Sequence, residues 1–179
     1  MSLNWLCQKW GQVQEVFEHP ATLLAPYPDE SINQALWDVS CNAFDALTDA
    51  HIEWSARRRF IDSFEPLYRD LFAAHCQPVL GHRSEAGSAL NSSCYMWWDL
   101  LWYHEHDPRT DDACLESMRS ILAIDHVACQ EGALHGLGHW HQRHSAEVEG
   151  IIDEYLQRNP RLCEELRKYA GSARAGRVL

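Results

Sequence analysis

The chain has 179 residues, enough for one domain or a small array of repeats that buries a core of its own. Its 15 basic and 26 acidic residues give a formal net charge of −11, and an acidic surface repels a phosphate backbone, so nucleic-acid binding is not expected. No run of 18 apolar residues occurs, so no membrane span is expected, and the first residues lack the pattern of a signal peptide.

Apolar residues recur at intervals of three and four almost throughout, a spacing that predicts amphipathic helices rather than strands. Prolines, glycines and their neighbours divide the chain into helices. In chain order, the expected helices cover residues 4–18, 30–50, 55–75, 86–104, 110–124, 127–143 and 146–158, with a short last helix after Pro160.

Three segments of the chain are expected to differ in organisation. Residues 1–28 would form an N-terminal helix and a linker, residues 29–170 a domain of helical repeats, and residues 171–179 a frayed tail. The repeats are predicted because three short runs in the second helix of each pair align without gaps. These runs are Phe64-Glu-Pro-Leu67, Leu115-Glu-Ser-Met118 and Val148-Glu-Gly-Ile151. Stacked helix pairs bury one continuous core, and an ordinary helical bundle is the alternative.

One stretch, residues 125–138, resembles the first helix of a HEAT-like repeat of the short bacterial type. Asp125 stands at the loop aspartate of that family, whereas Cys129-Gln130 replaces its usual Val-Arg. The residues that match its Ala-Leu and Leu-Gly pairs are Ala133, Leu134, Leu137 and Gly138. The resemblance implies an all-α fold, a short right-handed α–α superhelix of about three helix pairs. It also implies a concave face in a family that mostly serves as binding scaffolds, although a DNA-glycosylase branch and a bilin-lyase branch exist.

Acidic residues recur at one position of the aligned second helices. If the pairs stack, these carboxylates line up on one face, where they would attract a basic partner. The alternative is a solvated position at which Glu is simply a good helix former. We therefore expect a cytoplasmic scaffold that binds a protein or peptide, with a basic partner favoured. The residues expected to contact it are Glu65, Arg69, Glu116, Glu149 and Asp153.

A histidine-rich loop, His104-Glu-His-Asp107, joins the helices of the middle pair. The repeat alignment places this loop beside His51 and His141, so that the stacked loops would share one edge. Imidazole and carboxylate groups bind divalent metals, which makes metal-dependent hydrolysis the alternative function. The candidate ligands at this edge are His104, His106, Asp107 and His141. His106-Asp107 also resembles the HD phosphohydrolases, but Pro108 places the pair in a loop.

A second histidine cluster lies on the expected helix 127–143. His135 and His139 are one turn apart and share a face, and Glu131 precedes them by another turn. Together they could offer three ligands to zinc or iron. The HExxH motif is absent, because Gly136 stands where the catalytic glutamate would follow His135. The alternative is a pair of ordinary surface or half-buried histidines.

Three glycines in the same helix, at positions 132, 136 and 138, need a reason, because each costs up to about 1 kcal/mol relative to alanine in a helix interior. We expect close packing against a neighbouring helix. The eight tryptophans are expected to fill gaps between helices, with an aromatic groove at Trp97, Trp98 and Trp102 as the alternative. The seven cysteines contain no CxxC pair and are expected to be reduced and mostly buried.

Overall fold

The computed structural model describes residues 10–43, 47, 49, 51–99 and 107–178, and every regular element in this part of the chain is helical. The predicted all-α class is therefore confirmed. No helix among the described residues is long and apolar enough to cross a membrane.

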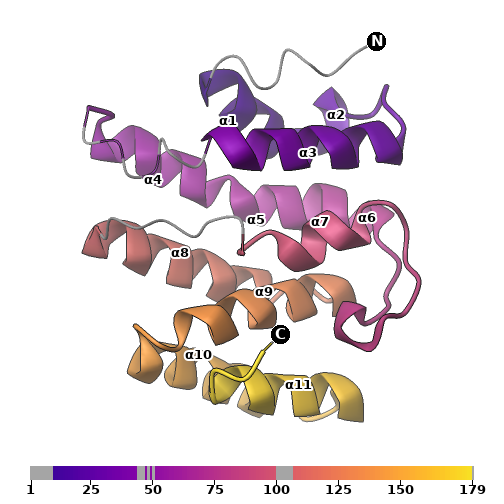
Figure 1. Cartoon of the computed structure of the whole chain (residues 1–179), viewed down its shortest axis with the longest axis vertical. Helices are drawn as coiled ribbons and strands as arrows, with labels where there is room; N and C mark the ends of the chain where they lie inside the picture. The colour runs from indigo at the N-terminus through magenta and orange to yellow at the C-terminus, as the bar shows by residue number, and fades with distance from the viewer. Residues whose placement is uncertain (1–9, 44–46, 48, 50, 100–106, 179) are drawn as a thin grey trace.

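The helices stack in two rows along the long axis of the molecule (Figure 1). The front row comprises α3 (Asp29–Ala43), α7 (Asn91–Met96), α9 (Val127–Trp140) and α11 (Glu164–Arg174). The back row comprises α4 (Trp54–Asp62), α5 (Phe64–Leu67), a π-helical turn (Tyr68–Phe72), α6 (Ala73–His75), α8 (Pro108–Ile121) and α10 (Ser145–Arg158). Helices α1 (Trp10–Glu18) and α2 (Pro20–Leu23) cover the N-terminal end, and a 3-10 turn, Gly81–Arg83, interrupts the loop before α7.

Several helix boundaries differ from the expected ones, and two of the differences have local reasons. The helix expected from residue 86 begins at Asn91, because the Asn91 side chain accepts hydrogen bonds from the backbone N–H groups of Gln77 and Ser88 and holds the preceding loop. The tail expected from residue 171 is helical to Arg174, because Ala173 is fully buried in the core.

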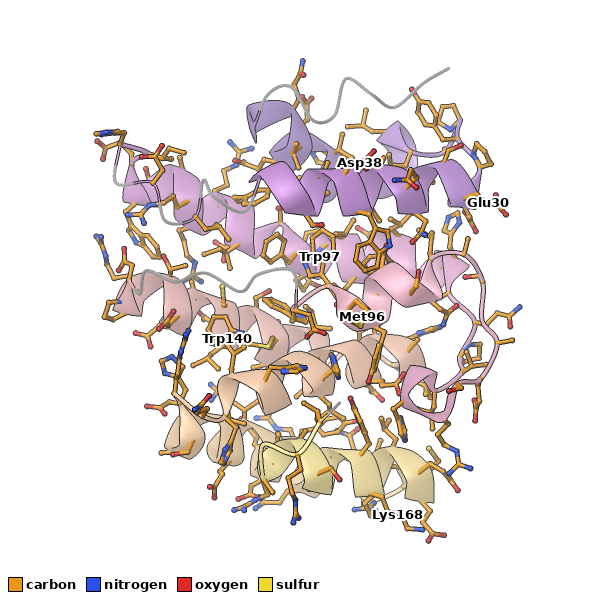
Figure 2. All side chains as sticks on the ribbon, in the orientation of Figure 1. Glu30, Asp38, Met96, Trp97, Trp140 and Lys168 are labelled. Carbon is orange, nitrogen blue, oxygen red and sulfur yellow. The ribbon has the colours of Figure 1, made fainter. Side chains whose placement is uncertain are left out.

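The core is rich in aromatic rings. Trp97 and Trp98 are buried, with 0% and 1% of their surface exposed, which confirms that they fill gaps between helices. The ring of Trp97 packs edge-on against Phe17 and Phe64, with centroids 5.4 and 5.7 Å apart. Figure 2 shows Trp97 in the middle of the stack and Lys168 at its periphery. Trp102 lies outside the described residues.

The glycines of α9 bring this helix against its neighbours, as predicted. A Cβ atom on Gly136 would stand 2.5 Å from Cβ of Trp98, and one on Gly138 would stand 2.6 Å from Val178. A Cβ on Gly132 would overlap the carbonyl oxygen of Cys94. Helix α7 therefore lies on the backbone of α9 along one flank, and the α11 segment lies on it along another.

The structure describes the side chains of five cysteines, all with free thiols, and four of these are buried. Burial raises the pKa of the Cys114 thiol, which keeps it protonated and unreactive. This agrees with the expectation of reduced, mostly buried thiols. The buried four are Cys76, Cys94, Cys114 and Cys129.

Candidate metal centre

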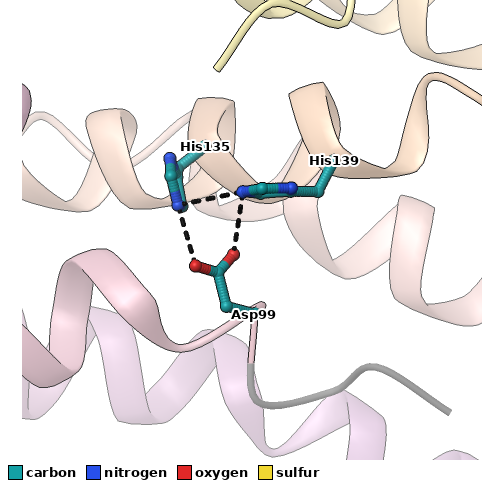
Figure 3. A group of neighbouring side chains, drawn as sticks. All are labelled: Asp99, His135 and His139. Carbon is teal, nitrogen blue, oxygen red and sulfur yellow. Dashed lines mark hydrogen bonds and ion pairs between the residues drawn. The ribbon is translucent and has the colours of Figure 1, made fainter. Parts of the chain in front are cut away.

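Three side chains converge where the end of α7 meets α9. Asp99, three residues past the end of α7, points its carboxylate at His135 and His139 on one face of α9 (Figure 3). The distance from His135 Nε2 to Asp99 Oδ2 is 3.0 Å, and the distance from His139 Nε2 to Asp99 Oδ1 is 3.3 Å. The two Nε2 atoms are 3.2 Å apart. Among the described residues, this is the one group of three or more metal-ligating side chains whose ligand atoms lie this close together.

The separation of the two Nε2 atoms matches the spacing of ligands around a single metal ion, and each nitrogen lies at a similar distance from one oxygen of the Asp99 carboxylate. Ligand atoms bound at roughly 2.0–2.2 Å lie roughly 3.0–3.5 Å from one another when the angles at the metal are about 90–110°. The two imidazoles and the carboxylate supply the N,N,O set found in catalytic zinc sites and in non-haem iron sites. The arrangement therefore fits a divalent transition metal.

The burial of the group leaves one side open. His135 is 1% exposed, Asp99 is 20% exposed and His139 is 35% exposed. A metal held by these three atoms would be covered on the His135 side and accessible near His139. Such a site leaves a coordination position for water or substrate, as catalytic sites do and closed structural sites do not.

The charge of Asp99 has no full counter-charge within the described part of the chain. Its ion pairs there are with His135 and His139, and Oδ1 is buried without a hydrogen bond. Burial, followed by the charge of His135, lowers the pKa of His139 below its usual value of 6.5, whereas Asp99 acts in the opposite direction. A neutral His139 offers a lone pair to a metal but little charge to Asp99. The described part of the chain therefore places no lysine or arginine charge beside Asp99.

Tyrosines hold His135 in place from the other side of its ring. His135 Nδ1 is 2.7 Å from the hydroxyl of Tyr169 on α11, which is 3.0 Å from the hydroxyl of Tyr95 on α7. Burial is the main cause that raises the pKa of Tyr169, so this phenol stays protonated and neutral. In the tautomer that donates Nδ1–H to Tyr169, Nε2 of His135 would present its lone pair to the site, which is the usual arrangement around a metal-binding histidine.

The predicted third ligand, Glu131, belongs to a different set of contacts. Its carboxylate is 1% exposed and accepts hydrogen bonds from the backbone N–H groups of Gly81 and His82, at 2.7 and 3.0 Å. The imidazole of His82 also contacts it, with Nδ1 2.5 Å from Oε1. Glu131 thus fixes the loop before α7 on α9, and Asp99 takes the place beside the histidines that the spacing had assigned to Glu131.

The histidine-rich loop edge is only partly described. His104 and His106 lie outside the described residues, so their role as ligands stays a prediction. Asp107 caps the N-terminus of α8, accepting from the Arg109 backbone N–H at 3.0 Å, and also pairs with Arg57. The Arg109 guanidinium, together with Arg57, holds the pKa of Asp107 below its usual range. His141 faces Glu149 at 3.5 Å. Asp107 and His141 therefore do not join the cluster around Asp99.

The residues predicted to bind a basic partner pair with arginines of the chain itself. Glu65 contacts Arg69 at 2.9 Å, and Glu116 contacts Arg58 at 2.8 Å. A further arginine, Arg174, binds both Glu149 and Asp153, at 3.0 and 2.8 Å. These carboxylates are spread over α5, α8 and α10 and do not gather into one cluster.

Asp99 is the member of this candidate site that the sequence interpretation did not identify. It is separated from His135 by 36 residues and follows Trp97 and Trp98, whose burial dominates that stretch. The available signal was a lone acidic residue directly after two core tryptophans, one helical turn past Tyr95. That signal alone does not indicate a partner.

Comparison with known proteins adds no relative to this geometry. No protein-family model, curated protein or solved structure matches the chain. The HEAT-like resemblance of residues 125–138 thus stays a prediction.

Proposed function

We propose that the protein binds one divalent transition-metal ion through Asp99, His135 and His139 and acts as a metal-dependent hydrolase. The observation that carries the proposal is the convergence of three side chains at a half-open site: the two imidazole Nε2 atoms are 3.2 Å apart, and each lies 3.0–3.3 Å from one of the two oxygens of the Asp99 carboxylate. Zinc is the first choice, since two histidines and one carboxylate are a common catalytic zinc set.

The half-buried carboxylate of Asp99, whose Oδ1 is buried, supports this proposal independently of the distances. A carboxylate removed from water is unfavourable unless a counter-charge or several donors stabilise it. Asp99 faces two imidazoles, of which His139 has a lowered pKa, and has no lysine or arginine partner in the described part of the chain. A bound divalent cation would supply a positive charge beside Asp99 and would accept lone pairs from all three groups.

Each part of the site has a role in hydrolysis. When bound, the metal would polarise a substrate oxygen and lower the pKa of a water molecule at its open position. Asp99 and His139 would hold the ion at the accessible side, and His135 would hold it from the buried side. Tyr169 would fix the orientation of the His135 ring through Nδ1. Gly136 occupies the place of the HExxH glutamate, so this helix does not supply a general base in the manner of those metalloproteases.

Zinc titration of untagged, metal-free protein tests the binding half of the proposal. Calorimetry is expected to give one equivalent of zinc for the unchanged chain. Asp99→Ala and His139→Ala should each weaken binding by more than about a hundredfold, because loss of a direct ligand exceeds the tenfold to hundredfold effect of an outer partner. The matched control is His75→Ala, which removes a half-exposed histidine paired with Asp29 elsewhere. Equal zinc affinity in all four proteins would disprove the site.

The hydrolytic half needs a separate measurement. Chromogenic carboxylic esters, phosphate monoesters and phosphate diesters should be offered to the zinc-loaded protein. We expect turnover of one class that disappears on chelation, returns with zinc and is absent in Asp99→Ala. Stoichiometric zinc binding without turnover of any class would contradict a hydrolase and leave a metal-binding protein.

The helical framework supports a second, architectural proposal. We propose that the two rows of helices belong to a short right-handed α–α superhelix of the HEAT-like kind, because α7, α9 and α11 follow one another in one row while α8 and α10 alternate with them in the other. A protein- or peptide-binding role for this framework receives less support than the metal centre, since the acidic groups expected to bind a basic partner already pair with arginines.

A further inference from the structure

A cavity of about 310 Å³ opens between the loop that precedes α7 and the helices α7 and α9. This volume falls at the lower end of the range of small-molecule sites. Tyr95, whose hydroxyl contacts that of Tyr169 beside the metal centre, and Glu131, which holds the loop through Gly81, form part of its wall. The other lining residues are Val79, Gly81, Glu85, Gly87, Ser88, Asn91, Ser92, Met96 and Ala128.

The loop that forms the outer wall is fixed at several points. Glu131 binds the N–H groups of Gly81 and His82, and Glu85 accepts a hydrogen bond from the Leu80 N–H at 3.0 Å. The Asn91 amide group donates to the Gln77 carbonyl oxygen at 2.9 Å and accepts from the Ser88 N–H at 2.8 Å. These bonds use the side chains of the wall to hold the backbone, so the cavity is formed before any ligand enters, and ordering the loop need not oppose binding.

The charge of the wall selects the ligand. Its charged members are the carboxylates of Glu85 and Glu131, and the described lining contains no lysine, arginine or histidine. The imidazole of His82 contacts Glu131 from outside the cavity. The surrounding chain has a net charge of −11. An anion would therefore be repelled, whereas a compact cation gains from the field.

The remaining wall groups match an alkylamine rather than a hydrated metal ion. Val79, Met96 and Ala128 supply apolar surface for a short carbon chain, and the phenol ring of Tyr95 supplies aromatic surface beside which an ammonium group is favourable. The hydroxyl groups of Ser88 and Ser92 can accept hydrogen bonds from an ammonium group. We infer that this cavity is a binding site for a small organic amine, in its protonated form, and that the site is distinct from the metal centre. The inference does not depend on the proposed hydrolase activity.

The test compares three four-carbon ligands of equal length and different charge. These are 1,4-diaminobutane, 1,4-butanediol and succinate, each titrated into metal-free protein and followed by the backbone amide signals of isotope-labelled protein. We expect the diamine to shift the signals of Gly81, Gly87, Ser88 and Ser92 in a saturable manner, and to bind more weakly as salt rises. The diol and the dianion should bind at least about tenfold more weakly, because each lacks the ionic attraction to the wall.

Two variants locate the effect. Glu85→Gln keeps the shape of the side chain and should weaken diamine binding about three- to fivefold, the effect of losing one exposed charge pair. Ser92→Phe starts from an exposed helical position and should abolish binding by filling the cavity, with an unchanged thermal unfolding curve. The matched control for charge is Glu147→Gln on α10, an exposed carboxylate outside the wall, which should change nothing.

Several results would overturn the inference. Equal affinity for the diamine and the diol would remove the charge argument. Diamine shifts scattered over acidic residues away from the loop would show counter-ion binding to the surface instead. Unchanged affinity in a folded Ser92→Phe protein would place the amine elsewhere. Because zinc is absent throughout, failure here leaves the metal titration unaffected, and failure of the metal titration leaves this result unaffected.

Discussion

Carboxylates in two regions of the molecule face different kinds of partner. The first region, called the outer region below, comprises ion pairs on α5, α8 and α10 of the back row. There Glu65, Glu116 and Glu149 each contact an arginine. At the junction of α7, α9 and α11, Asp99 contacts only His135 and His139 among the described ion pairs. In the first region, guanidinium groups that are always charged neutralise the carboxylates. The second depends on groups whose charge varies, and this is what makes it suitable for an added cation.

The two regions also differ in how strongly their geometry is fixed. The outer pairs join long, half-exposed side chains, and such pairs contribute roughly 0–1 kcal/mol each. The junction is built on close backbone contacts of α9 and on a chain of hydroxyl and imidazole hydrogen bonds. Changes in the junction should therefore have large effects and changes in the outer pairs small ones, an order that the following experiments examine.

The largest effect is expected from Gly136→Leu. Its side chain would occupy the position of the Trp98 side chain, so α7 and α9 must separate, and overpacking of this kind costs about 1–3 kcal/mol or more. Gly150→Leu is the matched control, because Gly150 lies in α10 with open space around its Cα. It should be neutral or stabilise by up to about 1 kcal/mol through helix propensity. Thermal unfolding of both proteins checks this, and equal melting temperatures would argue against a close α7–α9 contact.

Loss of one hydroxyl group beside the junction should reduce metal affinity without removing a ligand. Tyr169→Phe takes away the partner of His135 Nδ1, and outer-partner changes of this kind cost about tenfold to hundredfold in metal affinity. Tyr155→Phe removes another buried hydroxyl, which donates to Gln130 at 3.0 Å, and serves as the control for general loss of a tyrosine hydrogen bond. The zinc affinities of both variants are measured by calorimetry. Equal affinities would contradict a role of Tyr169 in positioning His135.

The pH dependence follows from the lowered pKa of His139. Between that lowered value and the unfolded value near 6.5, the unfolded chain holds more protons on this residue than the folded protein. The contribution of His139 to the free energy of unfolding therefore declines as pH falls through this window. Zinc competes with the same proton, so its affinity should be nearly constant above pH 6.5 and should decline only below it. An affinity that declines steadily from alkaline pH through pH 7 would mean that His139 titrates at or above its ordinary value.

The smallest effect is expected from Glu65→Gln in the outer region. The carboxylate pairs with Arg69, whose guanidinium keeps a second partner in Asp70 at 2.7 Å. The free energy of unfolding should change by less than about 0.5 kcal/mol, and less still at high salt. Denaturant unfolding at two salt concentrations measures this. A decrease of the free energy of unfolding by more than about 1 kcal/mol would show that the outer ion pairs also contribute substantially to stability, against the contrast between the two regions.

Much of the fold follows from local sequence patterns. The spacing of apolar residues predicts the helices, and the glycines at positions 132, 136 and 138 predict the close approach to α9. The one-turn separation of His135 and His139 predicts that they share a face, which the structure confirms. Each of these properties depends on residues within a few turns of one helix.

The identity of the third group in the cluster depends on how helices pack. Glu131 has the same one-turn spacing as the two histidines, and helix geometry alone does not separate it from them. The loop at Gly81 and His82 draws its carboxylate away, whereas the contact of Trp98 with Gly136 places Asp99 beside the imidazoles. Tertiary contacts between residues far apart in the sequence therefore determine which carboxylate lies beside the histidines. The repeat alignment instead predicted loop residues such as Asp107 as ligands.

The tryptophans provide the protein with an optical reporter of its own. Trp98 directly precedes Asp99, and Trp140 directly follows His139. A paramagnetic or coloured ion such as copper(II) at this position would quench the fluorescence of nearby indoles, whereas colourless zinc would leave most of it. Emission spectroscopy on the unlabelled protein can therefore distinguish which metal is present, and can follow its arrival in real time.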